Sequence, residues 1–173
     1  MKIRYQTGDA LAGPELFVIH GCNAYGVMGS GIAAQVRKQF PGAYTEYREC
    51  FERWKKQGMR FIPLGSYTAY YDGKKTIINA ITQKKFGGTP GVVYADYKAI
   101  RKFFKEFNKD IGSVHPQRSI NVAMPKIGAG LAGGDWQIIA QIIEEESINF
   151  QPVVYVWEDP ANSNTIQQHI RTA

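Results

Sequence analysis

The chain has 173 residues, a hydrophobic content of 44% and a formal net charge of +6. This length fits one domain whose core needs no disulfide or metal for stability. No apolar run approaches the ~20 residues of a membrane span, and the first residues lack the apolar core of a signal peptide. Cys22 and Cys50 are the only cysteines. We therefore expect a monomeric protein of the reducing cytoplasm with no membrane partner.

The positive charge fits an anionic partner, either nucleic acid or a soluble phosphorylated ligand. The basic residues are scattered, often in pairs such as Lys55-Lys56 and Lys84-Lys85, and no Arg-rich run or recognition-helix pattern occurs. The same composition also arises when Lys and Arg cover solvated helix faces. Charge alone therefore does not indicate nucleic-acid binding.

Strands and helices alternate along the chain. Residues 2–7 alternate apolar and polar side chains, as in a half-buried strand, whereas residues 16–21 form a continuous apolar run typical of a buried strand. Asp72-Gly73 predicts a hairpin turn between two further strands. The predicted strands cover residues 2–7, 16–21, 66–71, 76–81, 119–124 and 153–157. The predicted helices cover residues 32–40, 43–56, 93–107 and 135–148, and the polar tail beyond Pro160 allows a short helix. This order predicts an α/β sandwich with a parallel or mixed sheet.

Two glycine-rich turns follow predicted buried strands, at residues 21–32 and 125–136. Glycine lets the backbone approach a ligand, and the N–H groups of a helix's first turn attract anions. Two such turns suit a diphosphate, although each is also compatible with ordinary turn chemistry. Neither matches a P-loop or the dinucleotide fingerprint, because the first contains G-x-x-G-x-G and no lysine follows a final glycine.

His20 directly precedes the first turn and Cys22 lies in it, and the two could form a thiol–imidazole pair. The arginine of a C-x5-R phosphatase motif is absent, since Met28 occupies that position. A small buried cysteine is the simpler interpretation.

Several of these motifs together resemble a macro domain, over nearly the whole chain. The resemblance is closest to the branch with the fungal ADP-ribose-1''-phosphate phosphatase and the terminal ADP-ribose protein hydrolases. It implies a three-layer α/β/α sandwich with a central mixed sheet over residues 1–158, followed by a polar tail at 159–173. The motifs are Asp9, His20-Gly21-Cys22-Asn23, Gly29-Ser30-Gly31-Ile32-Ala33, Lys84-Lys85-Phe86-Gly87-Gly88, Pro125 with Gly128-Ala129-Gly130, and Val154-Tyr155-Val156-Trp157.

The resemblance also implies an ADP-ribose site. Asp9, with Ala10 beside it, would accept a hydrogen bond from the adenine amino group, and Trp157 would pack on adenine. Asn23 would lie at the distal ribose, and Gln83 would be a further ligand-binding residue. Each has a purely structural alternative: a cap for Asp9, a turn for Asn23 and a core position for Trp157. The phosphate loops would be Gly29, Ser30, Gly31 and Ile32, and Gly128, Ala129, Gly130 and Leu131.

The chain departs from the family's glycohydrolases at two positions. Those enzymes use a lysine after a strand-end threonine and, in some members, an aspartate in the second loop. Here Gln83 follows Thr82, and Ala132 occupies the loop position. Lys84 or Asp135 could substitute after a register shift, although Asp135 also fits a helix cap.

The resulting hypothesis is an ADP-ribose-1''-phosphate phosphatase in which His20 activates a water or protonates the leaving oxygen and Asn23 orients water or ribose. A glycohydrolase acting on ADP-ribosylated protein or nucleic acid, and a non-catalytic ADP-ribose-binding module, remain alternatives. No cofactor or metal is expected, because the three histidines lack ligand spacing.

Overall fold

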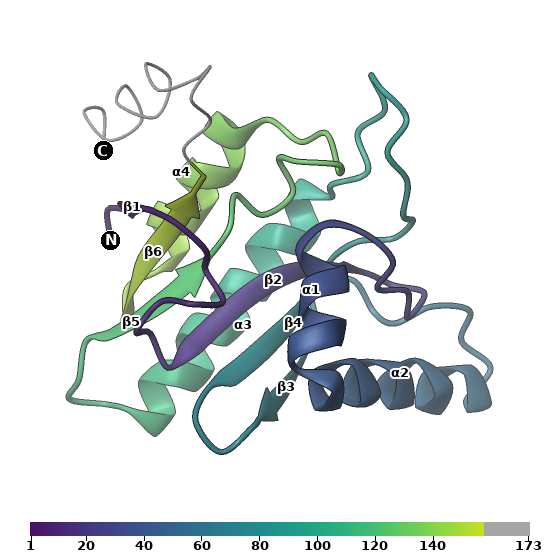
Figure 1. Cartoon of the computed structure of the whole chain (residues 1–173), viewed down its shortest axis with the longest axis horizontal. Helices are drawn as coiled ribbons and strands as arrows, with labels where there is room; N and C mark the ends of the chain where they lie inside the picture. The colour runs from purple at the N-terminus through teal and green to yellow at the C-terminus, as the bar shows by residue number, and fades with distance from the viewer. Residues whose placement is uncertain (158–173) are drawn as a thin grey trace.

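The computed structural model describes residues 1–157, so the tail predicted at 159–173 lies outside the described residues. Six strands form one mixed sheet in the order β1-β6-β5-β2-β4-β3, and only β3 pairs antiparallel. Helices cover both faces (Figure 1), which confirms the predicted three-layer α/β/α sandwich. The strands are β1 (Arg4–Thr7), β2 (Phe17–Asn23), β3 (Tyr67–Tyr71), β4 (Thr76–Gln83), β5 (Ile120–Met124) and β6 (Phe150–Val156). The helices are α1 (Gly31–Gln39), α2 (Pro41–Lys56), α3 (Tyr97–Val114) and α4 (Trp136–Glu146).

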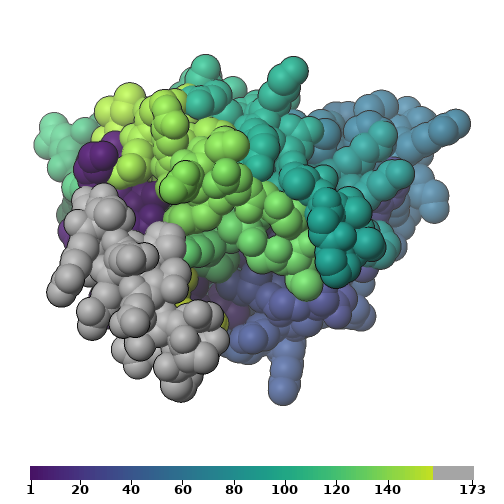
Figure 2. All heavy atoms as spheres, turned by 90° about the horizontal axis from the view of Figure 1, so that it is seen from above, coloured from purple at the N-terminus to yellow at the C-terminus, as the bar shows by residue number. Residues whose placement is uncertain are grey.

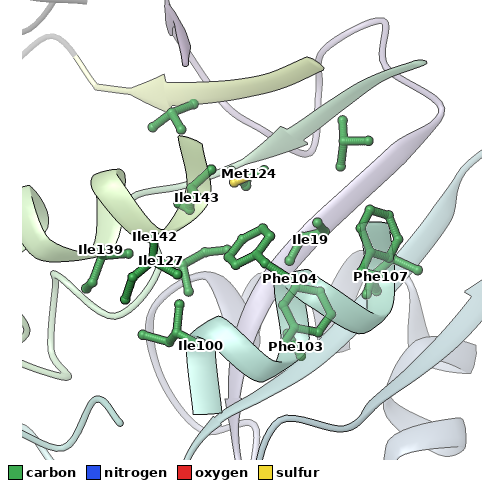
Figure 3. Packing of buried hydrophobic residues seen from close by; sticks show 14 of the residues in the cluster. Ile19, Ile100, Phe103, Phe104, Phe107, Met124, Ile127, Ile139, Ile142 and Ile143 are labelled. Carbon is green, nitrogen blue, oxygen red and sulfur yellow. The ribbon is translucent and has the colours of Figure 1, made fainter. Parts of the chain in front are cut away.

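The sheet separates two apolar cores. On one face, the aromatic residues Phe103, Phe104 and Phe107 of α3 pack with α4 against β2 and β5 (Figure 3). On the other face, Val36 of α1 and Tyr47 of α2 are fully buried in the second core. Because both faces of the sheet are covered, most residues of its central strands β2 and β4 are buried, as the sequence of β2 predicted.

The third helix differs from its predicted bounds. It begins at Tyr97 rather than at residue 93, and it continues to Val114. Asp96 is its N-cap and accepts a hydrogen bond from the Ala99 N–H at 2.9 Å. Residues 92–94 have no regular secondary structure, and Ala95 forms an isolated bridge with Gln83. The capping aspartate therefore starts the helix later than its apolar periodicity indicated.

The five parallel strands all end at the same edge of the sheet. The segments that follow them there are residues 8–16, 24–30, 84–96, 125–135 and the position after β6. Open α/β sheets bind their ligands outside such carboxyl ends. None of the helices in the described part is long and apolar enough to cross a membrane.

Candidate functional site

The first glycine turn is organised by the side chain of Asn23. Its Nδ2 donates to the Val27 carbonyl at 2.7 Å, and its Oδ1 accepts from the Tyr25 N–H at 3.0 Å. The Tyr47 hydroxyl lies 2.5 Å from the Asn23 carbonyl oxygen and 2.9 Å from its Oδ1. Asn23 thus has the turn-stabilising role that the sequence left open, and the ribose contact stays a prediction.

The turn leads into α1, whose N-terminus has no side-chain cap. Ser30 is the N-cap residue in an extended conformation, and its side chain makes no capping hydrogen bond. Gly31 begins the helix at φ 58°, in the left-handed region that favours glycine. Because the first N–H groups of a helix have no partner within it, this uncapped end can bind an anion.

The second glycine turn holds its shape through its own backbone. The Gly134 N–H donates to the Gly128 carbonyl at 2.7 Å, and the Gly133 N–H donates to the Gly130 carbonyl at 3.0 Å. Gly128 adopts φ 74°, and a Cβ there would lie 3.1 Å from Ile139. At Gly130, by contrast, a Cβ would meet nothing within 4 Å. The turn is therefore closely packed at its base and open at Gly130.

Leu131 brings the two turns together. A Cβ on Gly31 would lie 4.0 Å from Leu131 Cδ1, and a Cβ on Gly88 would lie 3.3 Å from Leu131 Cδ2. Leu131 nevertheless remains 57% exposed. Figure 2 shows the green residues of the second turn beside the teal residues of segment 84–96, with the blue residues of α1 below them. The predicted phosphate-loop residues Gly29, Ser30, Gly31, Ile32, Gly128, Ala129, Gly130 and Leu131 therefore belong to one region of the surface.

A β-bulge places Gln83 opposite Asn23. In the pairing of β2 with β4, Cys22 lies opposite Ile81, but Asn23 lies opposite Gln83, so Thr82 is the extra residue. Gln83 Nε2 donates to the Lys85 carbonyl at 2.7 Å. The Thr82 hydroxyl is buried and has no hydrogen-bond partner in the part of the chain that the structure describes.

Lys84 and Asp135, the two residues that could substitute for the glycohydrolase lysine and aspartate, each have another interaction in the structure. The Lys84 ammonium lies 4.4 Å from the centre of the Phe61 ring. Asp135 is the N-cap of α4, and its Oδ1 accepts from the Gln137 N–H at 2.9 Å. Ala132 is buried, and its carbonyl accepts from the Tyr94 N–H at 2.7 Å.

His20 is completely buried. Asn79 Nδ2 donates to the Ala43 carbonyl and to Thr68, which leaves Asn79 Oδ1 to accept from His20 Nε2 at 2.6 Å. Burial lowers the pKa of His20 to about 4, although the hydrogen bond with Asn79 opposes this shift. A neutral imidazole enclosed in the core has no contact with solvent, so its burial counts against direct proton exchange with a water.

Cys22 lies beside His20, with its Sγ 3.6 Å from the histidine Nε2. Burial raises the pKa of the Cys22 thiol, so the sulfur stays protonated. Both Cys22 and Cys50 are free cysteines. Cys22 is therefore the small buried cysteine that the sequence favoured over a reactive pair.

The predicted adenine-binding residues lie at the end of β1 and after β6. Asp9 Oδ1 accepts from the Leu11 N–H at 2.9 Å, which stabilises the turn that contains Ala10. Ala10 is buried, and Trp157 is 68% exposed, so Trp157 is no core residue. Their contacts with adenine stay predictions. Among residues 1–157, no group of three His, Cys, Asp or Glu side chains could hold a metal ion.

The sheet, with two glycine turns at the carboxyl ends of its parallel strands, identifies the class of protein. The macro domain family model matches residues 19–143, and the chain belongs to this family. Gly31, Gly128 and Leu131 all lie within the matched range, so the resemblance seen in the sequence is confirmed.

Several known proteins align with most of the chain. It is 31% identical to an uncharacterised 17.5 kDa protein of Enterobacteria phage T4, over 91% of this chain and 98% of the relative. It is also 31% identical to the ADP-ribose 1''-phosphate phosphatase of Candida albicans, over 89% of this chain and 99% of the relative. The DNA ADP-ribosyl glycohydrolase of Mycobacterium tuberculosis is 31% identical over 80% of this chain, which spans only 37% of that protein. The solved macrodomain of Mycobacterium tuberculosis DarG has a TM-score of 0.73 at 25% identity, covering 88% of this chain and 96% of that one.

Proposed function

We propose that this chain binds ADP-ribose and removes the 1''-phosphate from ADP-ribose-1''-phosphate. The observation that carries the proposal is the convergence of the two glycine turns at Leu131, beside the uncapped start of α1. A diphosphate between these turns receives backbone N–H groups from both sides. The Candida albicans relative named as a phosphatase supports the choice of reaction.

The reaction needs positioning more than covalent chemistry. A water oxygen attacks phosphorus, the bond from phosphorus to the ribose oxygen breaks, and that oxygen takes up a proton. The products are ADP-ribose and inorganic phosphate. Aligned backbone donors stabilise the charge that develops on the phosphoryl oxygens.

We assign His20 a positioning role in this scheme. Its hydrogen bond to Asn79 joins β2 to β4, and Asn79 in turn contacts the Ala43 carbonyl of α2. Because Asn23 lies three residues beyond His20 on the same strand, this network fixes the start of the first turn. Asn23 holds the turn through the hydrogen bonds of its side chain.

A second candidate is the removal of ADP-ribose from nucleic acid, which the name of the mycobacterial relative favours. Gln83 replaces the lysine expected for that chemistry, and the Lys84 ammonium lies against Phe61. A gel assay on ADP-ribosylated DNA and ADP-ribosylated protein distinguishes this reaction from phosphate release.

Binding is tested by calorimetry with ADP-ribose and two variants of Gly130. Gly130→Ala adds a methyl group where nothing lies within 4 Å, so we expect affinity close to wild type. Gly130→Glu places a negative side chain between the turns, and we expect roughly a tenfold or greater loss. Equal affinities for the two variants would remove the diphosphate site from this position.

Turnover is tested by phosphate release from ADP-ribose-1''-phosphate. The expected result is release by the wild-type protein and its loss in Gly130→Glu. Tight ADP-ribose binding with no phosphate release and no cleavage of ADP-ribosylated DNA or protein would show a non-catalytic binding module instead.

A further inference from the structure

Four lysines form a stripe along the exposed side of α3. Lys98, Lys102, Lys105 and Lys109 are separated by four, three and four residues, and all are exposed. At 3.6 residues per turn they fall within a sector of roughly 60° and span about 16 Å along the helix axis. The four lysines are not adjacent in sequence, and the helical conformation places them on one side of α3. We call these four residues the α3 lysine stripe.

The stripe has no acidic partner in the described part of the chain. Salt bridges there involve Lys2, Arg48 and Arg101, and none involves a stripe lysine. Arg101, on the α4 side of the stripe, contacts Glu145 and Glu146 at 2.7 and 2.8 Å. The four lysine ammonium groups of the stripe are therefore available to bind another molecule.

Acidic residues limit the stripe on its other side. Asp110 accepts a hydrogen bond from the Tyr67 hydroxyl of β3, and Glu106 is exposed next to Lys105. The aliphatic stem of Lys102 packs over Gly65, where a Cβ would lie 2.7 Å from Lys102 Cδ. The positive surface is thus a narrow line and not a broad patch.

We propose that the α3 lysine stripe binds the sugar–phosphate backbone of a nucleic acid. A nucleic-acid strand is a line of phosphates, and its charge complements a line of lysines. A membrane surface fits less well, because helices that bind membranes expose apolar side chains to the lipid. Here Phe103, Phe104 and Phe107 are all buried in the core.

The stripe begins close to the candidate site. Lys98 lies in the first turn of α3, directly after segment 84–96, which contributes Gly88 to the region around Leu131. A strand bound along α3 therefore extends from the carboxyl edge of the sheet toward its opposite edge. This binding surface is independent of the proposed ADP-ribose site, and it adds an anionic partner of a different size.

The test is fluorescence anisotropy with a labelled single-stranded oligonucleotide, the matching duplex and an RNA of the same sequence, over a salt series. The stripe variant carries Lys98→Gln, Lys102→Gln, Lys105→Gln and Lys109→Gln. The control variant carries Lys38→Gln, Lys55→Gln, Lys56→Gln and Lys74→Gln, which are exposed elsewhere. Each variant removes four positive charges, so the two have the same net charge.

We expect the wild-type protein to bind at about 50 mM salt and to weaken steeply as salt rises. The stripe variant should lose roughly tenfold or more in affinity, and its log–log salt slope on a single strand should fall by about 3. The control variant should stay close to wild type. Excess ADP-ribose should leave binding unchanged, which separates this result from the proposed enzyme activity.

Three results would overturn the proposal. The first is an equal loss in the stripe and control variants, which would mean that net charge alone drives binding. The second is no binding of the wild-type protein to any of the three nucleic acids at low salt. The third is stripe-dependent binding to vesicles of anionic phospholipid with none to nucleic acid.

Discussion

At the residue scale, burial decides what His20 and Asn23 can do. His20 is enclosed, neutral and hydrogen-bonded to Asn79, and Asn23 is 7% exposed with its amide used inside the turn. The strand-end position of both residues suggested contact with a ligand. Their hydrogen bonds show that both residues stabilise the strand end and the turn, and their contacts with a ligand stay predictions.

The burial of His20 makes stability depend on pH. The pKa is about 4 in the folded protein and about 6.5 in the unfolded chain, so between these values only the unfolded chain takes up the proton. Stability is therefore full above about pH 6.5 and falls as pH falls, by about 2 kcal/mol from pH 7 to 5. Urea unfolding across this range measures the loss.

NMR of the His20 ring gives an independent check. The imidazole should remain neutral at about pH 5, because its pKa is about 4. A His20 that titrates near its ordinary pKa would contradict the assignment.

The Tyr47 hydroxyl is predicted to support the first turn. Tyr47→Phe keeps the ring in the core but removes the hydroxyl donor from the Asn23 carbonyl, at a cost of about 1–3 kcal/mol, while Asn23 Oδ1 keeps the Tyr25 N–H. ADP-ribose affinity should fall as well, because the turn loses an anchor. Urea unfolding and calorimetry measure the two effects. Tyr44→Phe, on the same helix, is the matched control and should change neither.

At the element scale, the starts of the four described helices differ in how they are capped. Asp96 and Asp135 cap α3 and α4 with their side chains, whereas Ser30 makes no such bond at the start of α1. Phe40 makes no such bond at the start of α2 either, but Pro41 there has no N–H to cap. The uncapped start of α1 is the one that lies at a glycine turn. An uncapped N-terminus carries partial positive charge, which favours a bound phosphate group.

Asp135→Ala tests the cap against a catalytic role. Loss of the cap should lower the free energy of unfolding by about 1 kcal/mol and leave the rate of phosphate release per folded molecule unchanged. Asp96→Ala provides the comparison, since it removes an equivalent cap from α3. A collapse of turnover in Asp135→Ala alone would indicate that the carboxylate takes part in the reaction.

At the scale of the whole molecule, the sheet divides the apolar interior into two cores. Ile62 belongs to the core under α1 and α2, and Ile143 belongs to the core under α3 and α4. The strand ends at the candidate site all lie at one edge of the sheet, between the two cores. The site can therefore vary in its turns while both cores stay intact.

The two cores should respond independently to mutation. Ile62→Val and Ile143→Val each remove one buried methyl group and should each cost about 1 kcal/mol of unfolding free energy. In the double variant the losses should add to within about 0.5 kcal/mol, because the residues share no partner. Urea unfolding of the three variants measures this. A strongly non-additive result would show that the sheet transmits packing changes between its faces.

The sequence by itself determined the order of strands and helices, the hairpin at Asp72-Gly73 and the two glycine turns. These features depend on side-chain period and on turn residues, which are local. It also carried the family resemblance, through motifs spread from Asp9 to Trp157. The predicted start of α3 was wrong because the apolar periodicity also includes residues before Asp96, which caps the helix.

Only the tertiary structure decided which groups are buried and which turns meet. His20 is neutral because it is completely buried, and desolvation depends on neighbours that are distant in sequence. Asn79 of β4, which accepts its hydrogen bond, is held in turn by the Ala43 carbonyl and by Thr68. The meeting of Gly31 and Leu131 likewise depends on sheet order, which places β5 next to β2. The charges scattered along the sequence became a line only where α3 buried its apolar side and turned its lysines outward.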